Sequence, residues 1–134
     1  MPHLVLLYSG NLETETDMTA LCRRLADAML TVQDEQGQQV FPTGGVRVFA
    51  YPASHYAVAD GQHDYAFLYL NLRMGRGRTA AVKQRAGEVL LAAAKAHCEL
   101  LFAKRYLGLT LQVDEGQEVF DAKHSTIHPL FRKP

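Results

Sequence analysis

The order of the predicted secondary structure constrains this chain most: strand, helix and strand follow one another, and the same order then repeats. Short apolar runs predict the strands, and apolar residues at helical spacing predict the helices. The predicted elements are a strand at about residues 3–8, a helix at 17–34, strands at 46–51 and 63–74, a helix at 79–104 and a strand at 107–113. Each helical connection is long enough for a right-handed parallel crossover. We therefore expect an α/β fold of β-α-β-β-α-β order, with a four-stranded, mainly parallel or mixed sheet and two helices on one face.

The long strand at 63–74 has two apolar faces. Its even positions from 66 to 74 carry alanine, leucine and methionine, whereas Tyr65, Phe67 and Tyr69 point to the opposite side. Two helices can cover one of these faces, and soluble monomers avoid leaving a large apolar patch in water. We therefore expect an oligomer that buries the second face.

Length and composition fit a single domain over residues 1–134. A hydrophobic share of 48% is enough for a core, and 21% charged residues exclude a disordered composition. Residues from about 117 to 134 form an irregular tail, whose apolar side chains we expect to pack on the domain or on a neighbouring subunit.

The charge balance and the apolar pattern of the sequence limit the kinds of binding partner that we expect. Equal numbers of basic and acidic side chains, 14 of each, argue against nucleic acid, and no run approaches the roughly 18 apolar residues of a membrane span. Cys22 and Cys98 lie in helical patterns and predict buried, reduced thiols. With no secretory leader pattern, we expect a cytoplasmic protein. The six histidines lack metal-ligand spacing, so we expect no metal site.

The second residue is proline, and the first strand begins directly after it. If Met1 is removed, as a small second residue normally permits, the ring nitrogen of Pro2 becomes a free secondary amine. An α-amino group has a pKa of about 7.7–8.0, close to the range in which a general base works at neutral pH. Most Met-Pro starts are simply processed termini, but a strand here would anchor the amine. Pro2 is therefore a candidate catalytic base.

Two segments deliver arginines to the starts of predicted elements. Gly75–Thr79 places Arg76 and Arg78 at the beginning of a helix, where unpaired N–H groups and the helix dipole favour anions. Arg47 begins the second strand among apolar neighbours, where a charge needs a partner. A solvated turn and a surface arginine are the ordinary alternatives. The glycines also fit a loose dinucleotide-binding pattern, which we reject because the acidic residue expected about 20 positions later would lie inside the helix.

A proline amine and arginines together suit one reaction class, in which a small carboxylated substrate is the partner. The amine removes a proton from a carbon acid, while guanidinium groups bind carboxylates and the developing enolate. Nearby arginine and an apolar pocket would both lower the pKa of the amine and so keep it unprotonated.

Six segments, spread in order over nearly the whole chain, match a known pattern. They are Met1-Pro2-His3, Phe41-Pro42 followed by Gly45-Val46-Arg47, Ala59–Phe67, Gly75-x-Gly77-Arg78, Gln84-x-Ala86-Gly87-Glu88 and His128-x-Leu130-Phe131. In these segments the chain resembles the 5-carboxymethyl-2-hydroxymuconate Δ-isomerase family of the tautomerase superfamily, whose members use an amino-terminal proline.

The resemblance implies a homotrimer of β-α-β-β-α-β subunits, with active sites near the subunit boundaries. It also implies cofactor-free isomerisation of a dienol or unsaturated keto acid in homoprotocatechuate breakdown. By position in the motifs, Pro2 would be the general base, and Arg47 and Arg78 would bind carboxylates and polarise the enolate. Arg76 is a further candidate for substrate binding.

Three places depart from the family pattern. Phe49 stands where a second arginine is expected, Arg76 where a small residue is expected, and residues 34–39 resemble an insertion. These departures bear on the substrate more than on the reaction class. Two other functions stay open. One is a hydratase or decarboxylase of a small acid that also uses Pro2; the other is a non-catalytic oligomeric binding protein, which a retained Met1 would favour.

Overall fold

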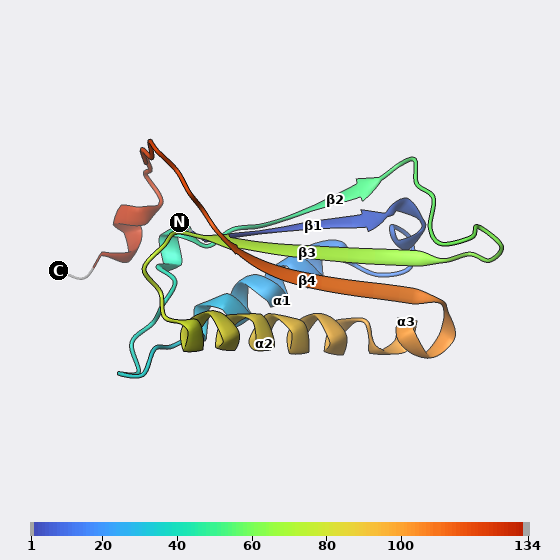
Figure 1. Cartoon of the computed structure of the whole chain (residues 1–134), viewed down its shortest axis with the longest axis horizontal. Helices are drawn as coiled ribbons and strands as arrows, with labels where there is room; N and C mark the ends of the chain where they lie inside the picture. The colour runs from blue at the N-terminus through green and yellow to red at the C-terminus, as the bar shows by residue number, and fades with distance from the viewer. Residues whose placement is uncertain (1, 133–134) are drawn as a thin grey trace.

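The computed structural model describes residues 2–132 and confirms the expected α/β fold (Figure 1). Its helices and strands are β1 His3–Ser9, α1 Met18–Leu30, β2 Val48–Ala53, β3 Ala66–Met74, α2 Ala80–His97, α3 Glu99–Lys104 and β4 Leu107–Glu115. Three short 3₁₀ turns are Gly10–Leu12, Thr43–Gly45 and His128–Phe131. Over the part of the chain that is described, no helix is both long enough and apolar enough to cross a membrane.

The four strands form one mixed sheet in the order β2-β1-β3-β4. β1 pairs with β2 in parallel and with β3 in antiparallel orientation, and β3 pairs with β4 in parallel. Each parallel pair is connected through helix, so two β-α-β halves meet at the antiparallel β1–β3 pair. This arrangement puts β1, and with it the amino end of the chain, in the interior of the sheet.

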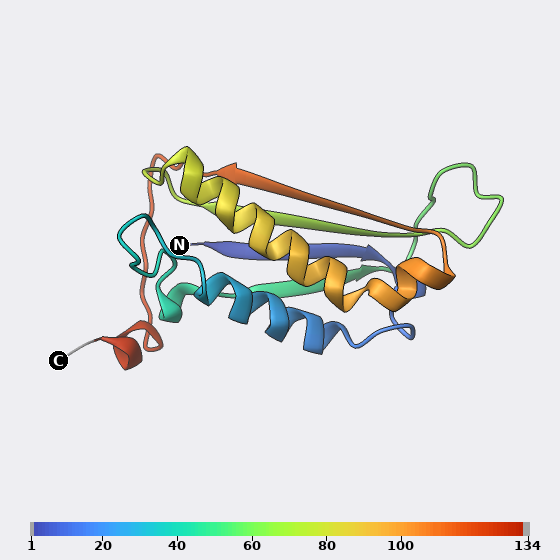
Figure 2. The same cartoon turned by 90° about the horizontal axis from the view of Figure 1, so that it is seen from below.

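The core lies between the sheet and the two long helices, which cover the same face (Figure 2). β3 directs its even-numbered residues toward the helices, and all are buried, as its alternation predicted. α1 contributes Leu21, Leu25 and Met29, each fully buried at helical spacing. Asp17 and Thr79 begin the two helices, since their side-chain oxygens accept hydrogen bonds from backbone N–H groups three residues later.

Two predicted helices differ from the observed ones in extent. The predicted helix at 79–104 is two helices, because the backbone of Cys98 (φ −96°, ψ 9°) leaves the α-helical region between α2 and α3. The first helix ends at Leu30, and the polar stretch after it turns at Asp34, whose carboxylate accepts two backbone N–H hydrogen bonds. Both cysteines are free thiols; Cys98 is buried as expected, whereas Cys22 is only partly buried.

The sheet face opposite the helices is uncovered in the single chain (Figure 1). We call it the open face, and its large apolar side chains are Val5, Leu7, Phe49, Tyr51, Phe67 and Tyr69. The four most exposed of them leave between 41% and 52% of their surface in water. The second apolar face that the alternation of β3 predicted is therefore present, and it extends over β1 and β2.

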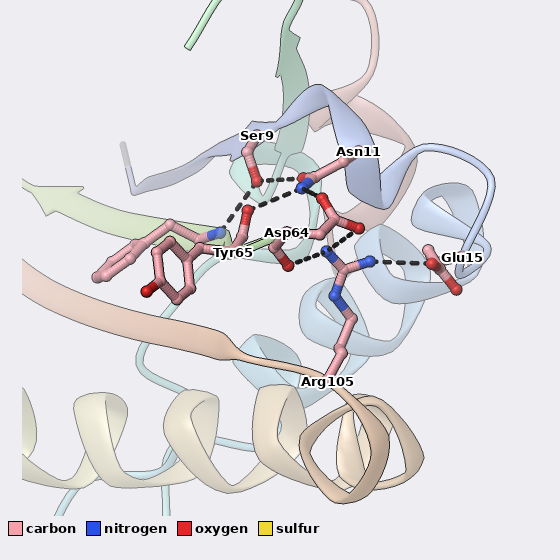
Figure 3. Close-up of polar contacts among 7 residues, drawn as sticks. Ser9, Asn11, Glu15, Asp64, Tyr65 and Arg105 are labelled. Atoms are coloured by element: carbon pink, nitrogen blue, oxygen red, sulfur yellow. Dashed lines mark hydrogen bonds and ion pairs between the residues drawn. The ribbon is translucent and has the colours of Figure 1, made fainter. Parts of the chain in front are cut away.

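Polar side chains tie β1, β3 and β4 together at the end of the sheet far from the amino terminus (Figure 3). The hydroxyl of Ser9 donates to Asn11 Oδ1 at 2.6 Å, and Asn11 Nδ2 donates to Asp64 Oδ1 at 2.9 Å. The nearly buried guanidinium of Arg105 then binds Glu15 Oε1 at 2.9 Å and the Asp64 carbonyl oxygen at 3.1 Å. These contacts fix the loop that leads into β3, so turn and strand-end structure account for its polar residues.

Candidate active site

Pro2 is buried at the amino end of β1, between the start of β2 and the end of β3. His3 pairs with Arg73 of β3, and the next N–H along the chain donates to the carbonyl oxygen of Arg47 at 3.1 Å. Both neighbouring strands therefore hold this segment in place, as the anchored amine requires. Removal of Met1, on which the predicted amine depends, falls outside the described residues.

Arg47 is half-buried and stands immediately before β2. Its guanidinium Nη1 donates to the carbonyl oxygen of Gly45 at 2.9 Å. Arg47 forms no ion pair with a carboxylate among residues 2–132. The positive charge of Arg47 is therefore available to an anionic ligand.

Arg47 lines a cavity of about 360 Å³, which we call the amino-end cavity. Its lining residues are His3, Arg47, Arg73, Gly75, Glu118, Asp121, Ala122, Lys123 and His124. Three of these side chains are permanent cations and two are carboxylates, so the wall has an excess of positive charge even with neutral histidines. The cavity begins one residue from Pro2 and is large enough for a small organic acid.

Arg78 lies in the loop between β3 and α2, next to the amino-end cavity. Its Nη1 donates to the carbonyl oxygen of Gly75, which lines that cavity, at 3.3 Å. Its guanidinium carbon stands 5.2 Å from the centre of the Phe41 ring, a cation–π contact. Burial lowers the pKa of Arg78 from its ordinary value, but a guanidinium remains charged at neutral pH.

Arg76 and Arg78 together line a second cavity, of about 480 Å³, which the polar loop after α1 also borders. This loop contributes Asp34 and Glu35, so the charges of the two arginines are balanced there. Within one chain, Arg47 thus belongs to the amino-end cavity and the other two predicted arginines to the second cavity. The hydrogen bond from Arg78 to the carbonyl oxygen of Gly75 connects the two cavities, since Arg78 lines the second cavity and Gly75 lines the amino-end cavity.

Of the basic side chains that line the amino-end cavity, four are not among the predicted site residues: His3, Arg73, Lys123 and His124. Alternation along β3 contained enough information to find Arg73, because its neighbours on both sides point into the core. The two residues of the tail had no comparable indication, since their position depends on contacts far away in the sequence.

Two other titratable groups with shifted pKa values, Tyr8 and His97, lie toward the opposite end of the sheet. Burial, together with a hydrogen bond to Glu13, raises the pKa of Tyr8 to about 12. His97 is half-buried with Nε2 2.9 Å from the Thr16 hydroxyl, and burial lowers its pKa. Within residues 2–132, no three His, Cys, Asp or Glu side chains gather as a metal ion would require. Packing and hydrogen bonding account for these groups.

Comparison with protein families and curated proteins gives one consistent result. Residues 2–131 match the model of the 5-carboxymethyl-2-hydroxymuconate isomerase family. The chain is 30% identical over 132 residues to a 5-carboxymethyl-2-hydroxymuconate Delta-isomerase of Escherichia coli, a match that covers 98% of this chain and 100% of the relative.

Solved structures agree with this result. A crystal structure of a 5-carboxymethyl-2-hydroxymuconate delta-isomerase is 59% identical, with a TM-score of 0.96 over 100% of this chain and 95% of that one. A 5-carboxymethyl-2-hydroxymuconate isomerase from Deinococcus radiodurans R1 is 36% identical, with a TM-score of 0.88 over 98% and 95%. A fused 4-OT symmetric trimer, 18% identical, shares the fold with a TM-score of 0.59 over 97% and 99%. This chain is therefore an isomerase that belongs to the 5-carboxymethyl-2-hydroxymuconate isomerase family of the tautomerase superfamily, as its motifs indicated.

Proposed function

We propose that this chain catalyses the cofactor-free isomerisation of 5-carboxymethyl-2-hydroxymuconate, or of a similar polycarboxylated keto or enol acid in homoprotocatechuate degradation, with Pro2 as general base. The names of the relatives supply the substrate. The observation that carries the proposal is a buried proline at the start of an interior strand, one residue from a cavity with excess positive charge. A fixed base beside carboxylate-binding cations is the arrangement that this reaction needs.

In the proposed reaction, Pro2 moves one proton along a conjugated system. With Met1 removed, the ring nitrogen takes a proton from the hydroxyl of the dienol, and the electron pair shifts through the double bonds to a carbon atom. The protonated nitrogen then returns the proton to that carbon, so substrate and product are isomers and no co-reactant is consumed. Burial and nearby cations would both lower the pKa of such an amine and so favour its unprotonated form.

The arginines bind and polarise the substrate in this proposal. Arg47 binds a carboxylate in the amino-end cavity, where its guanidinium is available. Arg78 stabilises the enolate charge from the side of Gly75, with its guanidinium oriented by the Phe41 ring. Arg76 is exposed and takes part only for a ligand that extends into the second cavity.

We further propose that the protein acts in the cytoplasm as a homotrimer in which the open face is buried. The uncovered apolar side chains of the open face support association of copies. Apolar residues of the tail support it too, since Val119, Phe120, Ile127, Leu130 and Phe131 are each more than half exposed in the single chain. Two free thiols fit a reducing compartment.

Intact-mass analysis followed by an ultraviolet assay with 5-carboxymethyl-2-hydroxymuconate tests this function. We expect the protein to have the mass of the chain without Met1. We also expect the absorbance to change while the product keeps the molecular mass of the substrate. Release of carbon dioxide, or addition of water to a small unsaturated acid, would instead assign the protein to the decarboxylases or hydratases of the superfamily. A retained Met1 together with no turnover would make it a binding protein.

A further inference from the structure

The chain after β4 crosses the amino end of the sheet and is attached on both sides of it (Figure 1). We call residues 116–131 the C-terminal strap. At its start, the N–H of Gly116 donates to the carbonyl oxygen of Met74 at 2.8 Å. At its end, a 3₁₀ turn packs on the loop before β2 so closely that a Cβ on Gly44 would lie 2.6 Å from the Cα of His128. The middle of the strap is therefore held over the amino end.

This middle part of the strap forms one wall of the amino-end cavity. The strap contributes Glu118, Asp121, Ala122, Lys123 and His124, and the sheet and its loops contribute His3, Arg47, Arg73 and Gly75. Lys123 on the strap and Arg47 beside the sheet thus share a space of about 360 Å³. That volume lies within the range of about 300–1,000 Å³ in which proteins bind small ligands.

The charges in this cavity leave room for an anionic ligand. Arg73 Nη2 lies 3.8 Å from Glu118 Oε1, and the ammonium of Lys123 pairs with the Asp121 carboxylate. Lys123 and Asp121 are 45% and 55% exposed, and ion pairs of this kind between exposed neighbours contribute little stability. A ligand carboxylate can therefore replace Asp121 at Lys123 at small cost, while Arg47 forms no ion pair with a carboxylate of residues 2–132.

We propose that Lys123 binds one carboxylate of the substrate while Arg47 binds another, so that the C-terminal strap determines specificity for acids with more than one carboxylate. The inference rests on the proposed function for the class of substrate. It assigns a role to a residue outside the helices and strands. It also explains why the strap is anchored at both ends: a binding lysine on a free tail would lose more conformational entropy when the ligand arrives.

Two non-reacting ligands of similar length separate the two carboxylate sites. Muconate has a carboxylate at each end of a six-carbon diene, and sorbate has one. Calorimetric titration of the full-length protein would compare wild type with Lys123→Gln, with Lys123→Arg and with Lys95→Gln, a change at an exposed lysine of α2 away from the cavity. We expect Lys123→Gln to weaken muconate binding about tenfold, the loss of one charged hydrogen bond, and sorbate binding less than about twofold. Lys123→Arg should restore muconate binding, and Lys95→Gln should match wild type.

The outcomes separate this proposal from the proposed function, because binding is measured without turnover. Equal weakening of both ligands by Lys123→Gln, no weakening, or no binding of muconate to wild type would each overturn the role of Lys123. If wild type fails to isomerise 5-carboxymethyl-2-hydroxymuconate but Lys123→Gln still discriminates between the two ligands, the strap site stands and the proposed reaction fails. Unchanged thermal unfolding of the variants would show that the fold is not the cause.

Discussion

Pro2 is one of five prolines, and removal of the preceding residue makes its ring nitrogen basic. Its burial at the start of β1 also fixes where that nitrogen lies. In the proposed mechanism, both the position and the base strength of the Pro2 nitrogen therefore depend on its surroundings at the start of β1. Arg47 and Arg78 differ from Pro2, because each is held by a backbone carbonyl and keeps its charge whatever happens to the terminus.

Replacing Pro2 by alanine should lower kcat by about 10²–10⁴-fold, the usual contribution of a general base. Alanine still permits removal of Met1, so the terminal amine is present but is no longer held by a ring. The measurement is kcat in the ultraviolet assay, with intact mass to confirm processing. Pro52→Ala, at an exposed position of the edge strand β2, is the matched control and should retain normal kcat. Near-normal turnover by Pro2→Ala would remove Pro2 from the mechanism.

Replacing Arg78 by alanine should lower kcat/KM, because a charged hydrogen bond to the substrate is lost. The expected loss of transition-state stabilisation is about 1.5–3 kcal/mol. Arg78→Lys keeps the charge but loses the planar contact with Phe41, so we expect an intermediate value. Steady-state kinetics with the muconate substrate would measure both. Arg23→Ala, which breaks an exposed ion pair on α1, should leave kcat/KM unchanged. Equal kinetics for Arg78→Ala and wild type would contradict the assignment.

At the scale of secondary structure, alternation and helical spacing predicted every strand and both long helices, because burial of one face leaves a period in the sequence. The break at Cys98 could not be predicted, since it depends on the local dihedral angles of a residue within an uninterrupted helical pattern. The pocket wall formed by Lys123 could not be predicted either. Its place depends on the packing of Gly44 against His128, and these residues are far apart in the sequence.

Replacing Gly44 by alanine should loosen the C-terminal strap, because the new Cβ would lie 2.6 Å from the Cα of His128 and the 3₁₀ turn must move. We expect faster amide hydrogen exchange over residues 117–131 and little change in β1 and β3. Gly87→Ala is the contrasting control: its Cβ would make an ordinary 3.6 Å contact with Val113, and a helical alanine should add about 0.5–1 kcal/mol of stability. Unchanged exchange in the strap of Gly44→Ala would show that this contact does not anchor it.

At the scale of the whole molecule, the two ends of the sheet have different tasks. At the amino end, Arg47 and the strap line a charged cavity, which begins one residue from the buried Pro2. At the opposite end, the hydrogen bonds and ion pairs of Arg105 fix the loop that leads into β3 (Figure 3). The open face lies between the two ends. If other copies of the chain bury this face, the active form is an oligomer and not a single chain.

Replacing Leu7 by arginine should dissociate the assembly. Leu7 lies on the interior strand β1, between Tyr51 and Tyr69 of the neighbouring strands, and 49% of its surface is exposed in the single chain. A charge placed there would be buried without a partner in a trimer, at a cost that exceeds the apolar gain. Sedimentation velocity at micromolar concentration should show wild type at three times the 14.9 kDa chain mass and Leu7→Arg at the chain mass. Leu100→Arg makes the same change at a 79% exposed position of α3, outside the open face, and should remain trimeric. A monomeric wild type, or a trimeric Leu7→Arg, would mean that the open face is not the surface through which copies associate.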